Sequence, residues 1–274
     1  MPLIRGHAMV GPEARSDLTY AKYGQATWEW WCHRNGVEFY PITEVPRAPA
    51  SLNLPPTFLR WFAIAHLLRG YSPGIRVAVV DADTMVRWDA PSIFASGGER
   101  LAAVRDSGVA WIDRSIAAYQ RVFPNVVLSS LQYFNAGVVV LGFFQLAVLH
   151  AFLELVRTQW VDLQSIIAGA NVGTDQTVLN FVVKREQEPV CFLPRAFNVT
   201  HCFPLDSVSS AMEHSAAPDG ELFRARVSSG ADSFQFLERG YVWHFTNVVR
   251  LRALAMQETW QRIRHRYPGA HLVS

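Results

Sequence analysis

The sequence predicts an α/β protein whose central sheet is mixed, mainly parallel and flanked by helices. The first observation behind this prediction is the apolar, β-branched run Arg76–Val80, which is typical of a buried parallel strand. The second is that residues 57–70 and 144–160 carry apolar side chains at helical spacing, with a further strand expected at 137–141. Helices that alternate with apolar strands form α/β folds, and such sheets bind ligands at the carboxyl ends of their strands.

The first part of the chain divides into two helices and two strands. Asn35-Gly36 would end the first helix as a C-cap does, and Gly70 would end the second. Five prolines indicate a loop between them. In order, the predicted elements are a helix at 18–34, a strand at 37–40, a loop at 41–56, a helix at 57–70 and a strand at 76–80.

The rest of the chain continues this alternation. Thr174 is a candidate N-cap for one of its helices. The predicted elements are a short helix at 91–94, a strand at 101–105, a helix at 113–122, a strand at 137–141, helices at 144–160 and 175–184, a polar surface segment at 206–233, a strand at 241–245 and a terminal helix at 251–266.

The composition indicates a folded protein and disfavours several classes. The 274 residues are 50% hydrophobic and 18% charged, which suits a globular chain with a sizeable core. A net charge of +2 without a basic run disfavours nucleic acid as a partner. Three cysteines without a CxxC pair favour a reducing compartment over a disulfide framework. No secretory signal or membrane-spanning stretch is visible, so we expect a cytoplasmic protein, with peripheral membrane contact through the Arg-rich terminal helix left open.

Two carboxylates stand where the strand at 76–80 ends. In an extended segment residues two apart point to the same side, so Asp81 and Asp83 can face one cation. Hard oxygen ligands of this kind favour Mg²⁺ or Mn²⁺. The alternative is a solvated acidic turn, which most Asp-X-Asp triplets are. The apolar strand that leads into the triplet favours the metal site.

Five motifs occur in an order that resembles a known enzyme family. The segment VVDADTMV is preceded by FLRWFAIAHLL and followed by YFNAGVVVLG, GTDQTVLN and VWHFTN. Their joint order resembles the GT-A glycosyltransferases, especially family 8 and its relatives. The resemblance implies a single GT-A-type catalytic domain over residues 1–274. Such an enzyme would move a hexose-type sugar from a nucleotide-sugar donor, a UDP-sugar by resemblance, to a glycan, lipid or protein hydroxyl.

The resemblance also implies a metal site with three ligands. Asp81 and Asp83 match the aspartates of the family's DxD motif, which bind the metal that bridges the donor diphosphate. His244 matches a late histidine that completes the set. An imidazole ligand favours Mn²⁺, with Mg²⁺ as the alternative. Without the resemblance, His244 between Trp243 and Phe245 would read as a core histidine.

Further residues match the family's donor-binding and catalytic positions, and each has a plainer structural reading. Arg60 could be an exposed helix arginine and Asp106 a turn residue. The segment from Asn135 could be a tight strand entry, and Asp175 with Gln176 could serve only the helix N-terminus. The donor-binding set implied by the resemblance is Arg60, Asp81, Asp106, Asn135, Ala136, Gly137 and Arg250, and the pair near the reacting carbon is Asp175 and Gln176.

The sequence departs from the family pattern at two places. After the histidine, Asn247 stands where family 8 enzymes often have glycine, and Arg250 stands where they have a lysine that touches the diphosphate. Arginine also pairs with phosphate, so Arg250 stays a candidate. The family's opening strand, which carries the contacts to the nucleotide base, is not predicted by the pattern of residues 1–17.

The resemblance implies retention of the anomeric configuration. Double displacement would need a carboxylate nucleophile, for which Asp175 is the nearest candidate, so front-face attack is the working hypothesis. Two other functions compete. A catalytically silent protein could bind sugar nucleotides or carbohydrate, and a haloacid-dehalogenase-type phosphatase also places Asp-X-Asp after an apolar strand. The phosphatases usually want Thr or Val where this chain has Met85.

Overall fold

The computed structural model describes residues 4–7, 19–42, 52–106, 109–169, 172–203, 234–246 and 251–272. Its contacts divide the chain into two compact units, which we describe separately. The first unit comprises Met1–Pro12, Tyr40–Val80 and Ile93–Leu193, and the second comprises Glu13–Phe39, Asp81–Ser92 and Pro194–Ser274. The predicted polar segment at 206–233 lies outside the described residues.

A six-stranded mixed sheet has the order β2-β1-β3-β6-β5-β7, and all of its strands except β2 lie wholly in the first unit. β3 pairs in parallel with β1, β5 pairs in parallel with β7, and β6 runs antiparallel to both β3 and β5. Four of these strands therefore share one direction, which confirms the predicted mixed, mainly parallel sheet. The strands are β1 (Ile4–His7), β2 (Glu38–Tyr40), β3 (Arg76–Val80), β5 (Leu101–Arg105), β6 (Phe134–Gly142) and β7 (Val190–Leu193).

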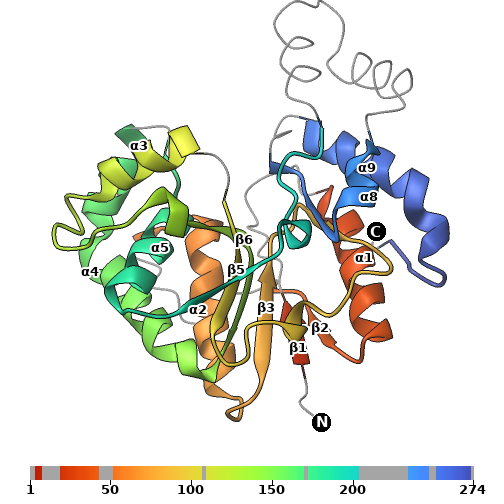
Figure 1. Ribbon diagram of the computed structural model, residues 1–274, viewed down its shortest axis with the longest axis horizontal. Coiled ribbons are helices and arrows are strands. Elements are labelled where there is room, and N and C mark those ends of the chain that lie inside the picture. Colours follow the sequence, from red (N-terminus) through yellow and green to blue (C-terminus); the bar gives the residue numbers. More distant parts are fainter. Residues whose placement is uncertain are drawn as a thin grey trace, which may run out of the picture. The chain divides into compact units, whose positions relative to one another are not determined.

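Helices pack beside this sheet because their apolar faces need cover. α2 (Pro56–Arg69) begins with a proline at its first turn and ends at Gly70, as the sequence predicts. It contacts α4 (Leu146–Gly169), which in turn contacts α5 (Asp175–Arg185). Figure 1 shows these helices and α3 (Val109–Tyr119) on one side of β3, β5 and β6.

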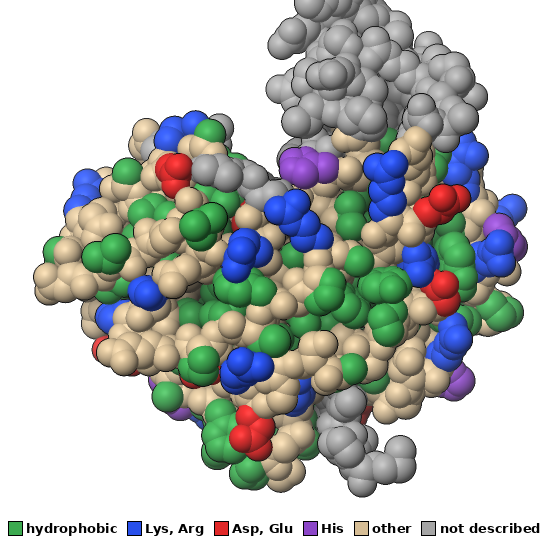
Figure 2. Space-filling model, in the orientation of Figure 1, with side chains coloured by type: hydrophobic (Ala, Val, Ile, Leu, Met, Phe, Trp, Pro, Cys, Tyr) green, Lys and Arg blue, Asp and Glu red, His purple; other side chains and the backbone are tan. Residues whose placement is uncertain are grey.

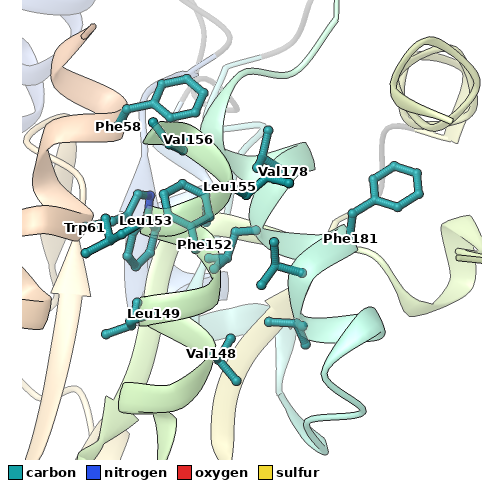
Figure 3. Close-up of a cluster of buried hydrophobic side chains, with 14 of the residues drawn as sticks. Phe58, Trp61, Val148, Leu149, Phe152, Leu153, Leu155, Val156, Val178 and Phe181 are labelled. Carbon is teal, nitrogen blue, oxygen red and sulfur yellow. The ribbon is translucent and has the colours of Figure 1, made fainter. Parts of the chain in front are cut away.

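Aromatic side chains fill the space between these helices. Phe58 of α2 stacks on Phe152 of α4 at a centroid distance of 6.0 Å and meets Trp160 edge-on at 5.2 Å. Figure 3 shows Phe58, Trp61 and Phe152 gathered with Leu and Val side chains of α4. Each fully buried side chain of this size contributes about 1.5–3 kcal/mol through the hydrophobic effect. This core fixes the positions from which α2 and α5 present their polar residues.

The second unit has its own aromatic core. Strand β4 (Thr84–Val86) pairs antiparallel with β8 (Val242–His244), and α1 (Ala21–Arg34) contacts both β4 and α9 (Arg252–Ile263). A short helix, α8 (Phe236–Arg239), precedes β8. The buried side chains of this core include Phe203, Phe236, Trp243, Phe245, Met256 and Trp260.

Several predicted boundaries differ from the structure. The helix expected at 113–122 begins earlier, at Val109, and the one expected at 144–160 continues to Gly169 across a break at Gln159, which has φ −122° and ψ 21°. Thr174 occupies the N-cap position of α5, but its hydroxyl donates to Asp175 Oδ1 (3.0 Å) and caps no backbone N–H, so its predicted capping role is wrong.

The structure also adds strands that the sequence pattern does not indicate. β1 lies within residues 1–17, where no strand is predicted, and it pairs with β3 from Ile4 to His7. Only one of its four residues is strongly apolar, so pairing rather than composition defines it. β4 has three residues and β7 four, which is too short for periodicity to be read.

Charged side chains are dispersed over the face of the molecule that Figure 2 shows. Figure 2 shows Lys and Arg side chains spread over this face rather than gathered in one patch. Large exposed hydrophobic side chains include Val127, Leu131, Phe144 and Val161. Among the described residues, no helix is long and apolar enough to cross a membrane.

Candidate metal centre and polar network

The chain turns sharply immediately after β3, at Asp81–Thr84. The Thr84 backbone N–H and hydroxyl both donate to the Asp81 carbonyl, at 3.0 and 2.6 Å. The Phe245 N–H donates to the Asp83 carbonyl at 2.9 Å. These bonds fix the backbone of the turn from which the two carboxylates project.

Helix α1 supports this turn through a glycine and a tryptophan. A Cβ on Gly24 would lie 2.5 Å from the Thr84 carbonyl oxygen and 2.9 Å from that of Ala82, so only glycine allows the helix this close. The Trp28 indole N–H donates to Thr84 Oγ1 at 3.0 Å. Trp28 and Trp31 are both buried.

His244 faces both carboxylates of the turn. Its Nε2 lies 3.5 Å from Asp81 Oδ2 and 3.2 Å from Asp83 Oδ1. The pairing of β4 with β8 places Thr84 opposite His244, which explains why residues so far apart in sequence meet. One ligand atom from each of the three residues lies within 4.8 Å of the others. No other group of three or more His, Cys, Asp or Glu side chains in the described parts of the chain is arranged to hold a metal ion.

The ring of His244 is also held on its other side. Its Nδ1 lies 3.0 Å from Asn198 Oδ1, and His244 is only 3% exposed. Burial lowers the pKa of His244, but the charge of Asp83, a hydrogen bond that the ring donates to Asp83 and the charge of Asp81 together raise that pKa above its ordinary value. The sequence contains no local signal for Asn198.

Asp83 bridges the histidine and an arginine. Arg252 Nε lies 3.1 Å from Asp83 Oδ2, while Asp83 Oδ1 faces His244. Burial raises the pKa of Asp83, but His244 and Arg252 outweigh burial and lower that pKa to about 2. Arg252 is two residues beyond the predicted Arg250, which lies outside the described residues together with Asn247.

The three predicted ligands fit a hard divalent cation. Bonds of about 2.1 Å at right angles separate neighbouring ligands of an octahedral ion by about 3 Å. The distances from His244 Nε2 to the two carboxylates, 3.2 and 3.5 Å, are close to this spacing. Two carboxylate oxygens with one imidazole nitrogen suit Mn²⁺, and Mg²⁺ less well.

The first unit holds a second group of predicted residues, centred on Asp175. This carboxylate is 2% exposed, and its Oδ2 accepts from Arg60 Nε (3.1 Å), Arg60 Nη2 (2.6 Å) and Trp61 Nε1 (2.8 Å). Thr174 Oγ1 donates to Oδ1. Arg60 is 7% exposed, so the alternative of an exposed helix arginine is wrong. Its partner lies 115 residues away, beyond the reach of local patterns.

Gln176 belongs to a neighbouring polar network at the start of β6. Asp106 Oδ2 accepts from Asn135 Nδ2 and from Gln176 Nε2, both at 3.0 Å. The amide oxygen of Gln176 accepts from the Ala136 N–H, and that of Asn135 accepts from the Gly137 N–H, both at 2.8 Å. Each amide is thus oriented from both ends, and all five residues were expected to act together by resemblance. The structure brings them into one network.

Aromatic and small residues border this network. Tyr133 Oη bonds Thr177 Oγ1 at 2.7 Å, and Trp111 meets the Tyr133 ring edge-on at 5.7 Å. A Cβ on Gly173 would lie 3.0 Å from Trp111 and closer still to Thr177 Oγ1, so glycine is required for this packing.

A cavity of about 980 Å³ lies elsewhere in the first unit. It is lined by α4, the end of α5 and β7, with Phe123, Leu155, Lys184 and Phe192 among its residues. None of the predicted site residues lines it. This cavity therefore does not coincide with the predicted site, whose residues are marked by the convergence of polar side chains.

Similarity to known proteins is found among solved structures. No protein-family model and no curated protein matches the sequence. Among solved structures, a glycosyltransferase involved in the glycosylation of the major capsid of PBCV-1 is similar at a TM-score of 0.54 and 13% identity, covering 94% of this chain and 100% of that one. This chain has the GT-A glycosyltransferase fold. At such low identity the likeness concerns the fold alone.

Two further structures have lower TM-scores. The galactosyltransferase LgtC, in complex with donor and acceptor sugar analogs, has 16% identity and a TM-score of 0.45, with 96% of this chain and 100% of that one covered. Mouse xyloside xylosyltransferase 1 has 13% identity and a TM-score of 0.44, with 89% and 97% covered. Within the GT-A fold, the role of each side chain must be argued from its own contacts.

Proposed function

We propose that this protein is a metal-dependent glycosyltransferase that moves a hexose-type sugar from a nucleotide sugar, with a UDP-sugar as the first candidate, to a hydroxyl of a glycan, lipid or protein. The observation that carries the proposal is the convergence of Asp81, Asp83 and His244 at the turn after β3. The GT-A fold supports it. A single catalytic domain over residues 1–274 is part of the same proposal.

The metal centre would handle the charge of the leaving diphosphate. A bound Mn²⁺, or alternatively Mg²⁺, would stabilise the negative charge that develops when the bond from the anomeric carbon to the diphosphate breaks. Asp81, Asp83 and His244 would hold the cation. Arg252 would add positive charge beside Asp83, and Arg250 stays a candidate for phosphate contact.

The polar network of the first unit is proposed to bind the donor sugar. Asp106, Asn135 and Gln176 offer carboxylate and amide groups whose orientation is already fixed by hydrogen bonds. Groups held in place before the substrate binds need no reorganisation in the transition state. Ala136 and Gly137 contribute through their backbone, since their N–H groups fix the two amides.

The environment of Asp175 favours front-face attack with retention. Both oxygens of this carboxylate accept hydrogen bonds, and one of them takes the Arg60 guanidinium. Such contacts stabilise its charge and lower its nucleophilicity, so we assign Asp175 to holding Arg60 and the start of α5, beside Gln176. The acceptor oxygen would bond to the anomeric carbon on the face that the diphosphate leaves, and the leaving phosphate would take the acceptor proton. A glycosyl adduct on Asp175, detected by mass spectrometry, would contradict this assignment.

A turnover screen tests the class of reaction. The full chain is incubated with Mn²⁺ and either sugar nucleotides or phosphate monoesters, and release of nucleoside diphosphate or of inorganic phosphate is measured. Nucleoside diphosphate release from one donor supports the proposal and names that donor. Phosphate release from monoesters alone would indicate a phosphatase. Metal-dependent donor binding without release in the presence of diverse acceptors would indicate a silent binding protein, and either result overturns the proposal.

A further inference from the structure

His244 makes polar contacts through both ring nitrogens, and they differ in kind. Nε2 faces the oxygens of Asp81 and Asp83, whereas Nδ1 lies 3.0 Å from Asn198 Oδ1. Carboxylate and amide oxygens both only accept hydrogen bonds, so without a cation either ring nitrogen has an acceptor to which it can donate. A cation bound through the Nε2 lone pair leaves the hydrogen of the neutral imidazole on Nδ1. Asn198 Oδ1 is the acceptor placed to receive the hydrogen bond from Nδ1.

The position of Asn198 is fixed by the backbone around it. Asn198 is 5% exposed, and its N–H donates to the Arg195 carbonyl at 3.0 Å. The next residue, Val199, donates to the Val242 carbonyl and accepts from the His244 N–H, both at 2.9 Å. Backbone hydrogen bonds therefore hold this segment to Arg195 through Asn198 and to β8 through Val199. The amide reaches the imidazole from a rigid support, which is what orientation of a ligand requires.

We propose that Asn198 is a positioning residue of the metal centre: its side-chain oxygen accepts the hydrogen bond from Nδ1 and so sets the ring orientation with which His244 presents Nε2 to a divalent cation. The inference rests on the proposed function, because it concerns the same metal. Partners of this kind, which hold a ligand without touching the metal, typically affect metal affinity by about 10–100-fold. The chain segment around Asn198 carries no metal-site motif, so only the structure shows this role.

The hydrogen bond from Nδ1 can be measured without any substrate in the protein loaded with Mg²⁺, which is diamagnetic. ¹⁵N–¹H correlation spectra detect a ring N–H whose exchange with water is slowed by a hydrogen bond. Of the nine histidines, the His244 signals are those missing from the His244→Gln spectrum. We expect a slowly exchanging Nδ1–H in the wild type and in Asn198→Asp, whose carboxylate accepts the same bond. In Asn198→Leu this signal should be lost through fast exchange.

Mn²⁺ affinity, measured by electron paramagnetic resonance titration, is the second readout. Asn198→Leu should bind Mn²⁺ about 10–100-fold more weakly than the wild type, and Asn198→Asp should bind at least as tightly. Asn35→Ala, which loses a side-chain bond to the Trp31 carbonyl at the end of α1, serves as a control of similar size and should leave affinity unchanged.

The outcomes separate the two levels of the account. If the wild type binds no Mn²⁺, the metal centre and the role of Asn198 both fail. If it binds and Asn198→Leu binds equally well, only the Asn198 inference fails. Should Asn198→Leu not fold, the Mg²⁺-loaded wild type still decides, because a His244 Nδ1–H that exchanges as fast as an exposed ring N–H contradicts the inference outright.

Discussion

Arg60 and Asp175 form a buried ion pair between α2 and α5, with Arg60 Nη2 2.6 Å from Asp175 Oδ2. The Arg60 guanidinium also lies 4.8 Å from the centre of the Trp61 ring, whose N–H reaches the same carboxylate oxygen. Two adjacent residues of one helix thus stabilise a charge at the first turn of another. Removal of either charge would leave the other buried and uncompensated.

Replacement of Arg60 should therefore cost much more stability than replacement of an exposed arginine. We expect Arg60→Met to lower the free energy of unfolding by about 3–5 kcal/mol, measured by urea denaturation. The matched control is Arg185→Met, since the Arg185–Glu186 pair is partly exposed on both sides and should contribute less than about 1 kcal/mol. Equal losses in the two variants would show that the buried pair is not the support described.

Gly24→Ala should weaken the metal centre although alanine is the better helix former. Helix propensity alone favours alanine by about 1 kcal/mol. The new Cβ, however, would stand 2.5 Å from the Thr84 carbonyl oxygen, so either α1 or the Asp81–Thr84 turn must move. Mn²⁺ affinity should fall by about tenfold or more, as for other supports of metal ligands. Gly169→Ala, where a Cβ meets nothing within 4 Å, is the control. Unchanged affinity in Gly24→Ala would show that the turn tolerates displacement.

The cysteines should differ in reactivity in the folded protein. Burial raises the pKa of Cys32 to about 12 and raises that of Cys202 further, whereas Cys191 is partly exposed. With a pKa about 12, roughly one thiol in ten thousand is ionised at pH 8. Iodoacetamide at pH 8 should thus modify Cys191 first, as judged by peptide mass spectrometry. Rapid labelling of Cys32 without loss of structure would contradict the packing of α1.

His150 should make the stability of the first unit depend on pH. Burial, followed by the charges of Arg69 and Arg157, lowers the pKa of His150, whose Nε2 accepts from Arg69. Because the folded pKa is below the unfolded value near 6.5, the contribution is complete above that value and is lost as pH falls through the folded pKa. His150 is largely exposed, so we expect under about 1 kcal/mol. Thermal unfolding of the wild type and of His150→Gln between pH 7 and 4.5 measures this contribution. A stability difference between the two proteins that does not change with pH would refute the prediction.

The sequence predicted the fold well where local patterns are strong. The apolar run before Asp81 indicated β3, and the helical spacing after Pro56 indicated α2. Local sequence patterns were sufficient for both. The opening strand β1 was missed because its sequence, Ile-Arg-Gly-His, has little strand character of its own. β1 pairs with β3, which lies some seventy residues further along the chain, and only this pairing defines β1 as a strand.

The residues of the Asp81, Asp83 and His244 cluster were predictable from the sequence, but the residues that support the cluster were not. Asp81 and Asp83 were indicated by their place after a strand, and His244 by family resemblance alone. Gly24, Asn198 and Arg252 carry no motif, because each acts through a contact with residues that are distant in sequence. The burial of Arg60 was missed for the same reason, since helical periodicity does not reveal a partner on another helix.

The most direct test of the account is metal-dependent release of nucleoside diphosphate from the donor found by screening. The rate is measured with Mn²⁺ and with EDTA for wild type, Asp83→Asn and Asp162→Asn, the last replacing an exposed carboxylate of α4. We predict release that EDTA abolishes, that falls about 100-fold or more in Asp83→Asn, and that is unchanged in Asp162→Asn. Full activity of Asp83→Asn, or release that persists in EDTA, would contradict a metal-dependent glycosyl transfer at this centre.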